Sequence, residues 1–174
     1  MDKKEGYTHV THTFLPVYNK ESQVLVLGSF PSVKSREQNC YYGHPQNRFW
    51  KVTAFLAGCP VPQTIEEKKE FLLANGIAVW DVIASCDIIG SSDSSIKNVV
   101  INDFRQVLEH SSIHTIYANG TKAYDLYCKY ARESTGREIV KLPSTSPANA
   151  AWNLDRLCDA WKAVVKNRDE VLNS

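Results

Sequence analysis

The order of apolar and polar stretches predicts a chain in which strands alternate with helices. The run VLVLGSF, over residues 24–30, is continuously apolar, which is typical of a strand buried on both faces of a parallel sheet. Similar runs follow at residues 77–83 and 113–120. A fourth begins at residue 138, where EIVKL leads into the polar segment PSTSPAN.

Helix signals lie between these runs. The stretch over residues 47–58 begins with Asn47, which can cap a helix, and ends at Gly58, which can terminate one. The next helix opens with a capping box, in which Thr64 is followed three residues later by Glu67. The predicted helices cover residues 47–58, 64–76, 100–111, 121–134 and 153–172.

This alternation predicts an α/β fold, a three-layer sandwich with a central, mostly parallel four-stranded sheet flanked by helices. A chain of 174 residues is long enough for one domain with a real core, so we expect residues 1–174 to form a single domain. In such sheets the ligand site lies beyond the carboxyl ends of the strands. The segments that directly follow the predicted strands are therefore the first place to search for chemistry.

Composition indicates a globular protein but does not identify what it binds. The net charge is +1 and 43% of the residues are hydrophobic, which is typical of a globular protein. Binding to DNA would therefore need a local concentration of positive charge. The N-terminus MDKKEGYTHV lacks an apolar run, and no stretch approaches the roughly 20 apolar residues of a membrane span. We expect a protein that is not secreted and not bound to a membrane, and that is intracellular (cytoplasmic in a prokaryote).

Cysteine and histidine usage predicts no metal and no cofactor. The five cysteines are widely spaced, and no C-x-x-C motif is present, so reduced thiols are expected rather than a zinc or iron–sulfur site. His9, His12, His110 and His114 lie outside the segments that follow the strands, and we interpret them as surface or structural residues. No G-x-S-x-G motif marks a serine nucleophile.

The segments that follow the first and second predicted strands offer groups for binding a planar ligand. In GSFPS, Gly28 allows close approach of the backbone, although an ordinary turn would have the same sequence. The segment NCYYGHP supplies Asn39 and Tyr42, and bases flipped out of DNA are held by such stacking and amide groups. Packing of the tyrosines in the core is the alternative. Asp81 could accept a hydrogen bond from a base N–H, or act as a turn residue.

The segment STSPAN, residues 144–149, follows the fourth predicted strand. Its hydroxyl groups and backbone amides suit contacts with phosphate. The alternative is a turn that caps the last predicted helix. Neither interpretation is decided by the residue types alone.

The motifs LVLGSFPS, YYGHPQNRFW and LPSTSPAN together resemble the uracil-DNA glycosylase superfamily. HPQNRFWKV is similar to the mismatch-specific branch, and the full set is most similar to the hypoxanthine-DNA (deoxyinosine) glycosylase branch. The resemblance spans about residues 22–165. It implies that Asn39 corresponds to an asparagine implicated in catalysis and that Tyr42 stacks on the flipped base. Phe30 replaces the asparagine that positions water in the mismatch-specific branch.

In the last motif, Ser144 lies where other branches hold a histidine or asparagine against the base, and Ala148 replaces an intercalating leucine. We therefore predict Asn39 as the catalytic residue. The predicted base-binding residues are Gly28, Ser29, Phe30, Tyr42, Asp81 and Ser144. The predicted DNA-binding residues are Ser32, Ser35, Thr145, Ser146, Pro147, Ala148 and Asn149, with Lys34, Arg36 and Arg48 contacting phosphates nearby.

The resemblance implies a DNA repair enzyme that excises hypoxanthine, the product of adenine deamination, from double-stranded DNA. No lysine nucleophile is evident in the motifs, so we expect a monofunctional, monomeric glycosylase that leaves an abasic site. Our own inference adds that Asp81 accepts from N1–H, which adenine lacks. Three alternatives stay open: a uracil or mismatch glycosylase, a non-catalytic protein that binds damaged DNA, and an α/β enzyme acting on a free nucleoside.

Overall fold

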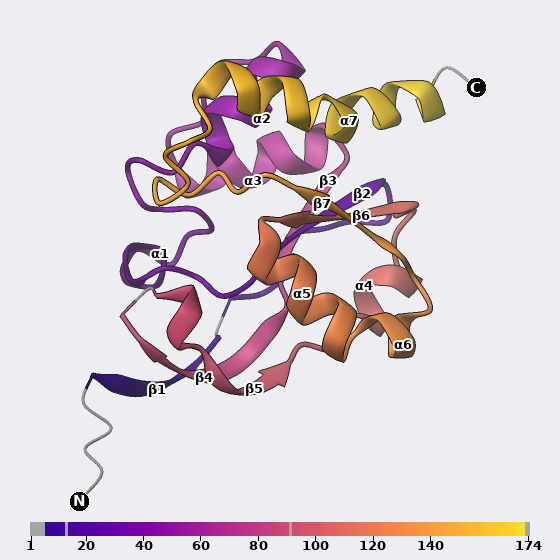
Figure 1. The fold of residues 1–174 in the computed structure, drawn as a ribbon. Coiled ribbons are helices and arrows are strands. Elements are labelled where there is room, and N and C mark those ends of the chain that lie inside the picture. The colour runs from indigo at the N-terminus through magenta and orange to yellow at the C-terminus, as the bar shows by residue number, and fades with distance from the viewer. Residues whose placement is uncertain (1–5, 13, 91, 173–174) are drawn as a thin grey trace, which may run out of the picture.

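A four-stranded parallel sheet forms the centre of the molecule, as predicted (Figure 1). The computed structural model describes residues 6–12, 14–90 and 92–172. The strands are β2 (Val24–Gly28), β3 (Ile77–Asp81), β6 (Thr115–Asn119) and β7 (Ile139–Leu142), and their order across the sheet is β3-β2-β6-β7. The predicted α/β architecture with flanking helices is therefore confirmed.

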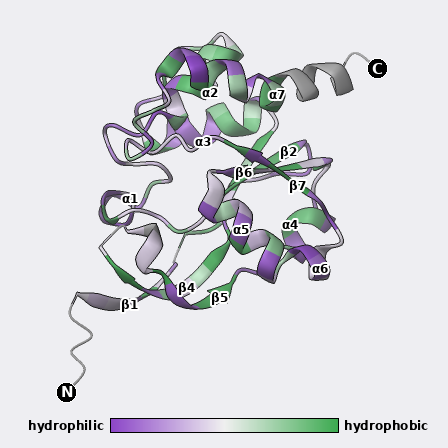
Figure 2. Ribbon diagram, viewed as in Figure 1, coloured by the Kyte–Doolittle hydropathy of each residue, from purple (hydrophilic) through white to green (hydrophobic). Residues whose placement is uncertain are grey.

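The apolar run of β2 is buried on both faces, which explains why it does not alternate with polar residues. Val24 and Val26 pack against one layer of helices, and Leu25 and Leu27 pack against the other side. Figure 2 shows the hydrophobic residues concentrated along β2. The first layer contains α2 (Phe49–Ala57), α3 (Ile65–Ala74) and α7 (Leu154–Leu172), and the other side carries α4 (Arg105–Glu109), α5 (Thr121–Tyr130) and α6 (Arg132–Thr135).

The helix ends follow the predicted signals closely. Gly58 adopts a left-handed conformation, with φ of +68°, at the end of α2. The Asn47 side chain accepts from the Phe49 backbone N–H at 2.9 Å. Thr64 accepts from the Glu67 N–H at 3.0 Å, so the first half of the capping box is formed at the start of α3. A further short helix, α1 (Val33–Gln38), follows β2.

A second sheet was not predicted. It is antiparallel and consists of β1 (Tyr7–Thr11), β4 (Ile83–Ile89) and β5 (Lys97–Ile101), in the order β1-β4-β5. A single 3-10 turn, Asp93–Ser95, lies between β4 and β5. The strand predicted over residues 77–83 is thus divided, because the chain leaves the central sheet after Asp81 and enters β4 at Ile83.

The helix predicted over residues 100–111 was wrong in its first part. Residues up to Ile101 form β5, and α4 covers only Arg105–Glu109. The short β5 is mostly solvent-exposed, so its sequence carries little apolar signal, and its pairing with β4 depends on the tertiary fold. Within the part of the chain that the structure describes, no helix is long and apolar enough to cross a membrane.

Candidate active site

A pocket of about 310 Å³ lies at the carboxyl ends of the central strands, where the parallel arrangement predicted a ligand site. Gly28, Asp81 and Asn119 end three neighbouring strands and all line it. The segment after β7 closes the pocket with Ser144 and the residues that follow. Its volume is at the lower end of the roughly 300–1,000 Å³ found for small-molecule sites.

Most of the predicted site residues meet in this pocket. The predicted base-binding residues Gly28, Ser29, Phe30, Tyr42, Asp81 and Ser144 all line it. Of the predicted DNA-binding residues, Ser32, Ser35, Thr145, Ser146, Pro147 and Ala148 also line it. The resemblance therefore brought together residues that are as much as about 120 positions apart in the chain.

Two predicted residues lie elsewhere. Asn39 ends α1 with a left-handed backbone, φ +53°, and borders a separate pocket of about 210 Å³ together with Trp50 and Lys68. Asn149 does not line the strand-end pocket, and its amide donates to the Ser144 carbonyl at 3.0 Å. The roles assigned to both residues stay predictions.

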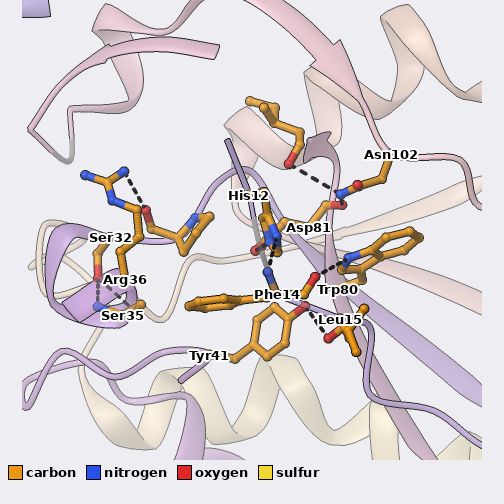
Figure 3. Close-up of polar contacts among 12 residues, drawn as sticks. His12, Phe14, Leu15, Ser32, Ser35, Arg36, Tyr41, Trp80, Asp81 and Asn102 are labelled. Carbon is orange, nitrogen blue, oxygen red and sulfur yellow. Dashed lines mark hydrogen bonds and ion pairs between the residues drawn. The ribbon is translucent and has the colours of Figure 1, made fainter. Parts of the chain in front are cut away.

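A buried histidine supports Asp81, and sequence reasoning missed it. His12 Nε2 lies 2.7 Å from Asp81 Oδ2, and the two side chains are 0% and 4% exposed (Figure 3). His12 follows β1, and β1 pairs with β4 so that Thr11 lies opposite Ser85. Because β4 continues the chain just after β3, this pairing carries His12 to the end of β3, where Asp81 lies.

Gly28 allows the Asp81 carboxylate to lie directly against the backbone of β2. A Cβ atom at this position would be 2.4 Å from Asp81 Oδ1 and 3.2 Å from the Tyr42 hydroxyl. Any side chain at position 28 would therefore displace both groups. The glycine of the first motif is thus required by the packing of two side chains from other segments.

Tyr42 enters the pocket from a strained loop. Its φ is +52°, which is uncommon for a bulky residue, and its ring stacks on Phe49 with centroids 4.3 Å apart. Its hydroxyl is buried and makes no hydrogen bond of ordinary geometry with the residues that the structure describes. Burial, followed by the nearby Asp81 carboxylate, raises the pKa of Tyr42 well above its ordinary value, and the Asn119 side chain lowers it by a smaller amount. The hydroxyl therefore keeps its hydrogen at neutral pH and can donate it.

The loop after β7 is held by a network of three polar side chains. Thr145, which is 0% exposed, donates through its hydroxyl to Asn47 Oδ1 at 2.8 Å. Asn119 donates to the same Thr145 hydroxyl at 3.0 Å and accepts from the Thr145 backbone N–H at 3.0 Å. These side chains satisfy one another, which fixes the loop against the ends of β6 and α2.

The side chain of Arg48 holds the same loop by bonding to the backbone carbonyls of the loop. Its guanidinium donates to the carbonyls of Ser146 at 2.9 Å and Asn149 at 3.1 Å, and also to those of Thr145 and Trp152. Four of its five N–H donors are thus used within the protein, and the expectation that Arg48 contacts phosphate stays a prediction. Arg36 likewise donates, through two longer bonds of 3.3 Å, to the carbonyls of Pro31 and Gly90.

The pocket also contains Asn119 and Asn47, to which sequence reasoning gave no site role. Asn119 carried a usable signal, because it ends a predicted strand directly before Gly120. His12 carried none, since it lies in a segment where no element was predicted and reaches the site only through an antiparallel pairing.

A three-layer α/β/α fold with a polar, aromatic pocket at the strand ends describes the class of this protein, and comparisons with known proteins define the family. The family model of the uracil DNA glycosylase superfamily matches residues 15–166. The chain belongs to this superfamily.

Two archaeal relatives are similar over most of their length. A protein from Methanosarcina acetivorans named hypoxanthine DNA glycosylase is 35% identical over 156 residues, which is 88% of this chain and 97% of the relative. A protein of the same name from Methanosarcina barkeri is 32% identical over 84% of this chain and 89% of the relative. The solution NMR structure of a candidate uracil DNA glycosylase from M. acetivorans superposes with a TM-score of 0.77 at 34% identity, covering 90% of this chain and 96% of the other.

Proposed function

We propose that this protein is a monofunctional DNA glycosylase that excises hypoxanthine from deoxyinosine in double-stranded DNA, leaving an abasic site. The observation that carries the proposal is the similarity, over nearly the whole chain, to two proteins named hypoxanthine DNA glycosylase. The residues of the three motifs that suggest this activity converge on one pocket. We further propose that the enzyme acts as a monomer and without a metal or cofactor.

The pocket would hold the base after it leaves the duplex. Extrusion costs a few kcal/mol, and less where the base is poorly paired. The ring of Tyr42 would stack on the purine through the face opposite Phe49, a contact worth roughly 1–3 kcal/mol. Asp81 would accept from the N1–H of hypoxanthine. Adenine has an unprotonated N1, and placing its lone pair against a buried carboxylate is unfavourable.

Cleavage of the N-glycosidic bond leaves negative charge on the departing base, and preorganised donors stabilise such charge by roughly 3–4 kcal/mol each. We propose that Asn39 is the donor to the base or holds the attacking water. Because Asn39 borders another pocket in the free protein, this role requires the loop between Asn39 and Tyr42 to rearrange when DNA binds. Left-handed backbone conformations at both of these residues are the strained points where such a change would occur.

Contacts with the DNA backbone would come from the rim of the pocket. Ser32, at the start of α1, and the segment from Ser146 to Asn149 lie around its mouth or beside it. The predicted DNA contacts of Ser35 and Thr145 would need these two side chains to become exposed, since they are 2% and 0% exposed in the free protein. Lys34 is exposed on α1 and pairs with Glu37 at 3.5 Å, a partner that it would exchange for a phosphate. Affinity for DNA is therefore expected to fall steeply as salt is added.

Uracil excision is the second candidate, favoured by the match to a structure described as a candidate uracil DNA glycosylase. Uracil carries an N3–H that could donate to Asp81 as N1–H of hypoxanthine does. Phe30 argues against efficient uracil removal, since it cannot position water as the asparagine of the mismatch-specific branch does.

The test is base release from duplexes that each carry one deoxyinosine or one deoxyuridine, with the wild type and Asn39→Ala. Release of hypoxanthine that falls sharply in the variant supports both the substrate and the role of Asn39. Release of uracil alone would show that uracil, and not hypoxanthine, is the base that the enzyme excises. Binding to damaged DNA without any base release would identify a non-catalytic protein, and trapping of a borohydride-reduced adduct would contradict the monofunctional mechanism.

A further inference from the structure

The hydrogen bonds of His12 determine where its hydrogen lies. Nδ1 accepts the backbone N–H of Phe14 at 3.1 Å, and a ring nitrogen that accepts a hydrogen bond carries no hydrogen. The ring hydrogen is therefore on Nε2, which donates to Asp81 Oδ2 at 2.7 Å. The second nitrogen of the same ring thus fixes His12 as a donor to Asp81.

An aromatic cage keeps this donor in place. The imidazole is 0% exposed, and the rings of Phe14, Phe30 and Tyr41 lie with their centroids 5.1, 5.9 and 6.1 Å from it. Figure 3 shows the imidazole beside Asp81, with Phe14 and Tyr41 nearby. Water cannot compete for the bond in such surroundings, and a hydrogen bond is stronger where the local dielectric constant is low.

The second carboxylate oxygen, Oδ1, is left free of the bond to His12, and the residues around it, Gly28 and Tyr42, line the pocket. Oδ1 lies over Gly28, beside the buried hydroxyl of Tyr42. Among the described residues that hydroxyl makes no hydrogen bond of ordinary geometry, although the Asn119 side chain is close enough to affect its pKa. The corner therefore combines an acceptor that His12 holds with a hydroxyl that can still bond to a ligand.

We propose that His12 is a positioning residue that selects the base through Asp81. By donating to Oδ2 it turns Oδ1 into the pocket as an acceptor, which matches a base with a ring N–H at its Watson–Crick edge and opposes adenine. This inference rests on the proposed glycosylase function, which it deepens by assigning the selection against adenine to a pair of residues rather than to Asp81 alone.

The proposal makes a specific prediction for Asp81→Asn. An amide has one acceptor and one donor end, and the His12 Nε2–H requires the acceptor. The amide oxygen would therefore face His12, and its NH₂ group would face the pocket. The pocket-facing atom would change from acceptor to donor, so the variant should disfavour hypoxanthine and tolerate the N1 acceptor of adenine.

The experiment measures single-turnover release of hypoxanthine and adenine from otherwise identical duplexes by the wild type, Asp81→Asn, His12→Gln and His12→Met. Asp81→Asn should lower the preference for hypoxanthine over adenine by roughly ten- to a hundredfold, the scale of one mispaired buried polar group. His12→Met, which keeps the size but removes the donor, should also lower this preference. His12→Gln, of nearly the same shape, supplies an N–H and should restore most of it.

A double variant tests the coupling between the two residues. In Asp81→Asn with His12→Met nothing fixes the amide, so it can turn its oxygen to the pocket and regain part of the hypoxanthine preference lost in Asp81→Asn alone. Additive losses in the double variant, or equal losses in His12→Gln and His12→Met, would show that His12 is only a structural residue. Thermal unfolding of each variant establishes that it folds.

If His12→Met does not fold, Asp81→Asn and His12→Gln decide the question, and an unchanged hypoxanthine preference in Asp81→Asn overturns the inference. If the wild type releases hypoxanthine and the variants at positions 12 and 81 show the same preference over adenine, this inference is overturned and the proposed function stands. Absence of hypoxanthine release by the wild type overturns both.

Discussion

The two walls of the strand-end pocket differ in where their polar side chains find hydrogen-bond partners. On one wall, which we name the Asp81 wall, Asp81 and Tyr42 converge over Gly28 with His12 behind them. On the other, the loop wall, Thr145 is held by Asn119 and Asn47, and Arg48 binds the loop backbone. The polar groups of the loop wall bond to one another, whereas in the Asp81 wall the buried Tyr42 hydroxyl makes no hydrogen bond of ordinary geometry with any described residue.

The difference indicates that one wall of the pocket stabilises the fold and that the other binds the ligand. A hydrogen bond made inside the protein adds stability, while a buried polar atom without a partner costs it. A fold retains such an atom where a ligand supplies the partner. Substitutions in the loop wall should therefore act on stability first, and substitutions in the Asp81 wall should act on activity and selectivity first. The following predictions test that division.

The largest effect on stability is expected for Arg48→Met. It removes a charged group that donates to four carbonyls of the loop, and each such bond contributes roughly 1.5–3 kcal/mol. We expect the free energy of unfolding in urea to fall by about 3 kcal/mol or more. Arg36→Met is the control, because it removes two longer bonds of 3.3 Å, and a comparable loss in that variant would contradict the special place of Arg48.

Thr145→Val should have the next largest effect. It keeps the shape of the side chain but removes the hydroxyl that accepts from Asn119 and donates to Asn47. The loss should be about 1–3 kcal/mol, since a buried amide loses its acceptor. Equilibrium unfolding measures it, and Thr145→Ser, which retains the hydroxyl, should remain close to the wild type. Equal losses in both variants would mean that the methyl group, and not the network, stabilises the loop.

Tyr42→Phe should have the opposite sign on stability. Removing a buried hydroxyl that lacks a partner should leave the unfolding free energy unchanged or raise it by up to about 1 kcal/mol. Base release should nevertheless slow, because the hydroxyl faces the ligand corner of the pocket. A less stable variant with normal base release would assign Tyr42 to the scaffold and remove the distinction between the two walls.

The smallest effect is expected for an exposed ion pair, which contrasts with the buried pair of His12 and Asp81. Arg105 donates to Asp103, and this lowers the pKa of Asp103 from 3.8 to about 2. Because the folded-state pKa is the lower one, the pair stabilises the fold above about pH 4, and this stabilisation is lost as the pH falls toward 2.

Arg105→Gln should therefore change stability only slightly at pH 7, since solvent screens an exposed pair. Unfolding curves of the wild type and the variant should converge below about pH 2. A difference that persists in acid would show that Arg105 acts through packing and not through Asp103.

The features that were predicted correctly are those that depend on residues close together in the sequence or on the burial of a whole strand. Strands β2, β3 and β6 were predicted because a strand buried on both faces is largely apolar, and that property is visible in the sequence alone. Strand β7, at the edge of the sheet, is half-exposed, and a short apolar run before a polar segment indicated it. Helix ends were predicted at Thr64 and Gly58, since capping depends on residues a few positions apart. Twelve of the predicted site residues meet at one pocket because parallel strands bring their carboxyl ends to one edge.

The sequence by itself thus determined the central sheet, the start of α3, the end of α2 and the segments that form the pocket, because each depends on local pattern. Only the tertiary structure decided how polar atoms are paired. It joined His12 to Asp81 across 69 residues through the antiparallel pairing of β1 with β4, turned Arg48 toward loop carbonyls, and buried the Tyr42 hydroxyl where no described residue bonds to it with ordinary geometry. Whether a hydrogen-bond donor is used inside the protein depends on neighbours that are distant in the chain. These neighbours cannot be identified from the residue type of the donor.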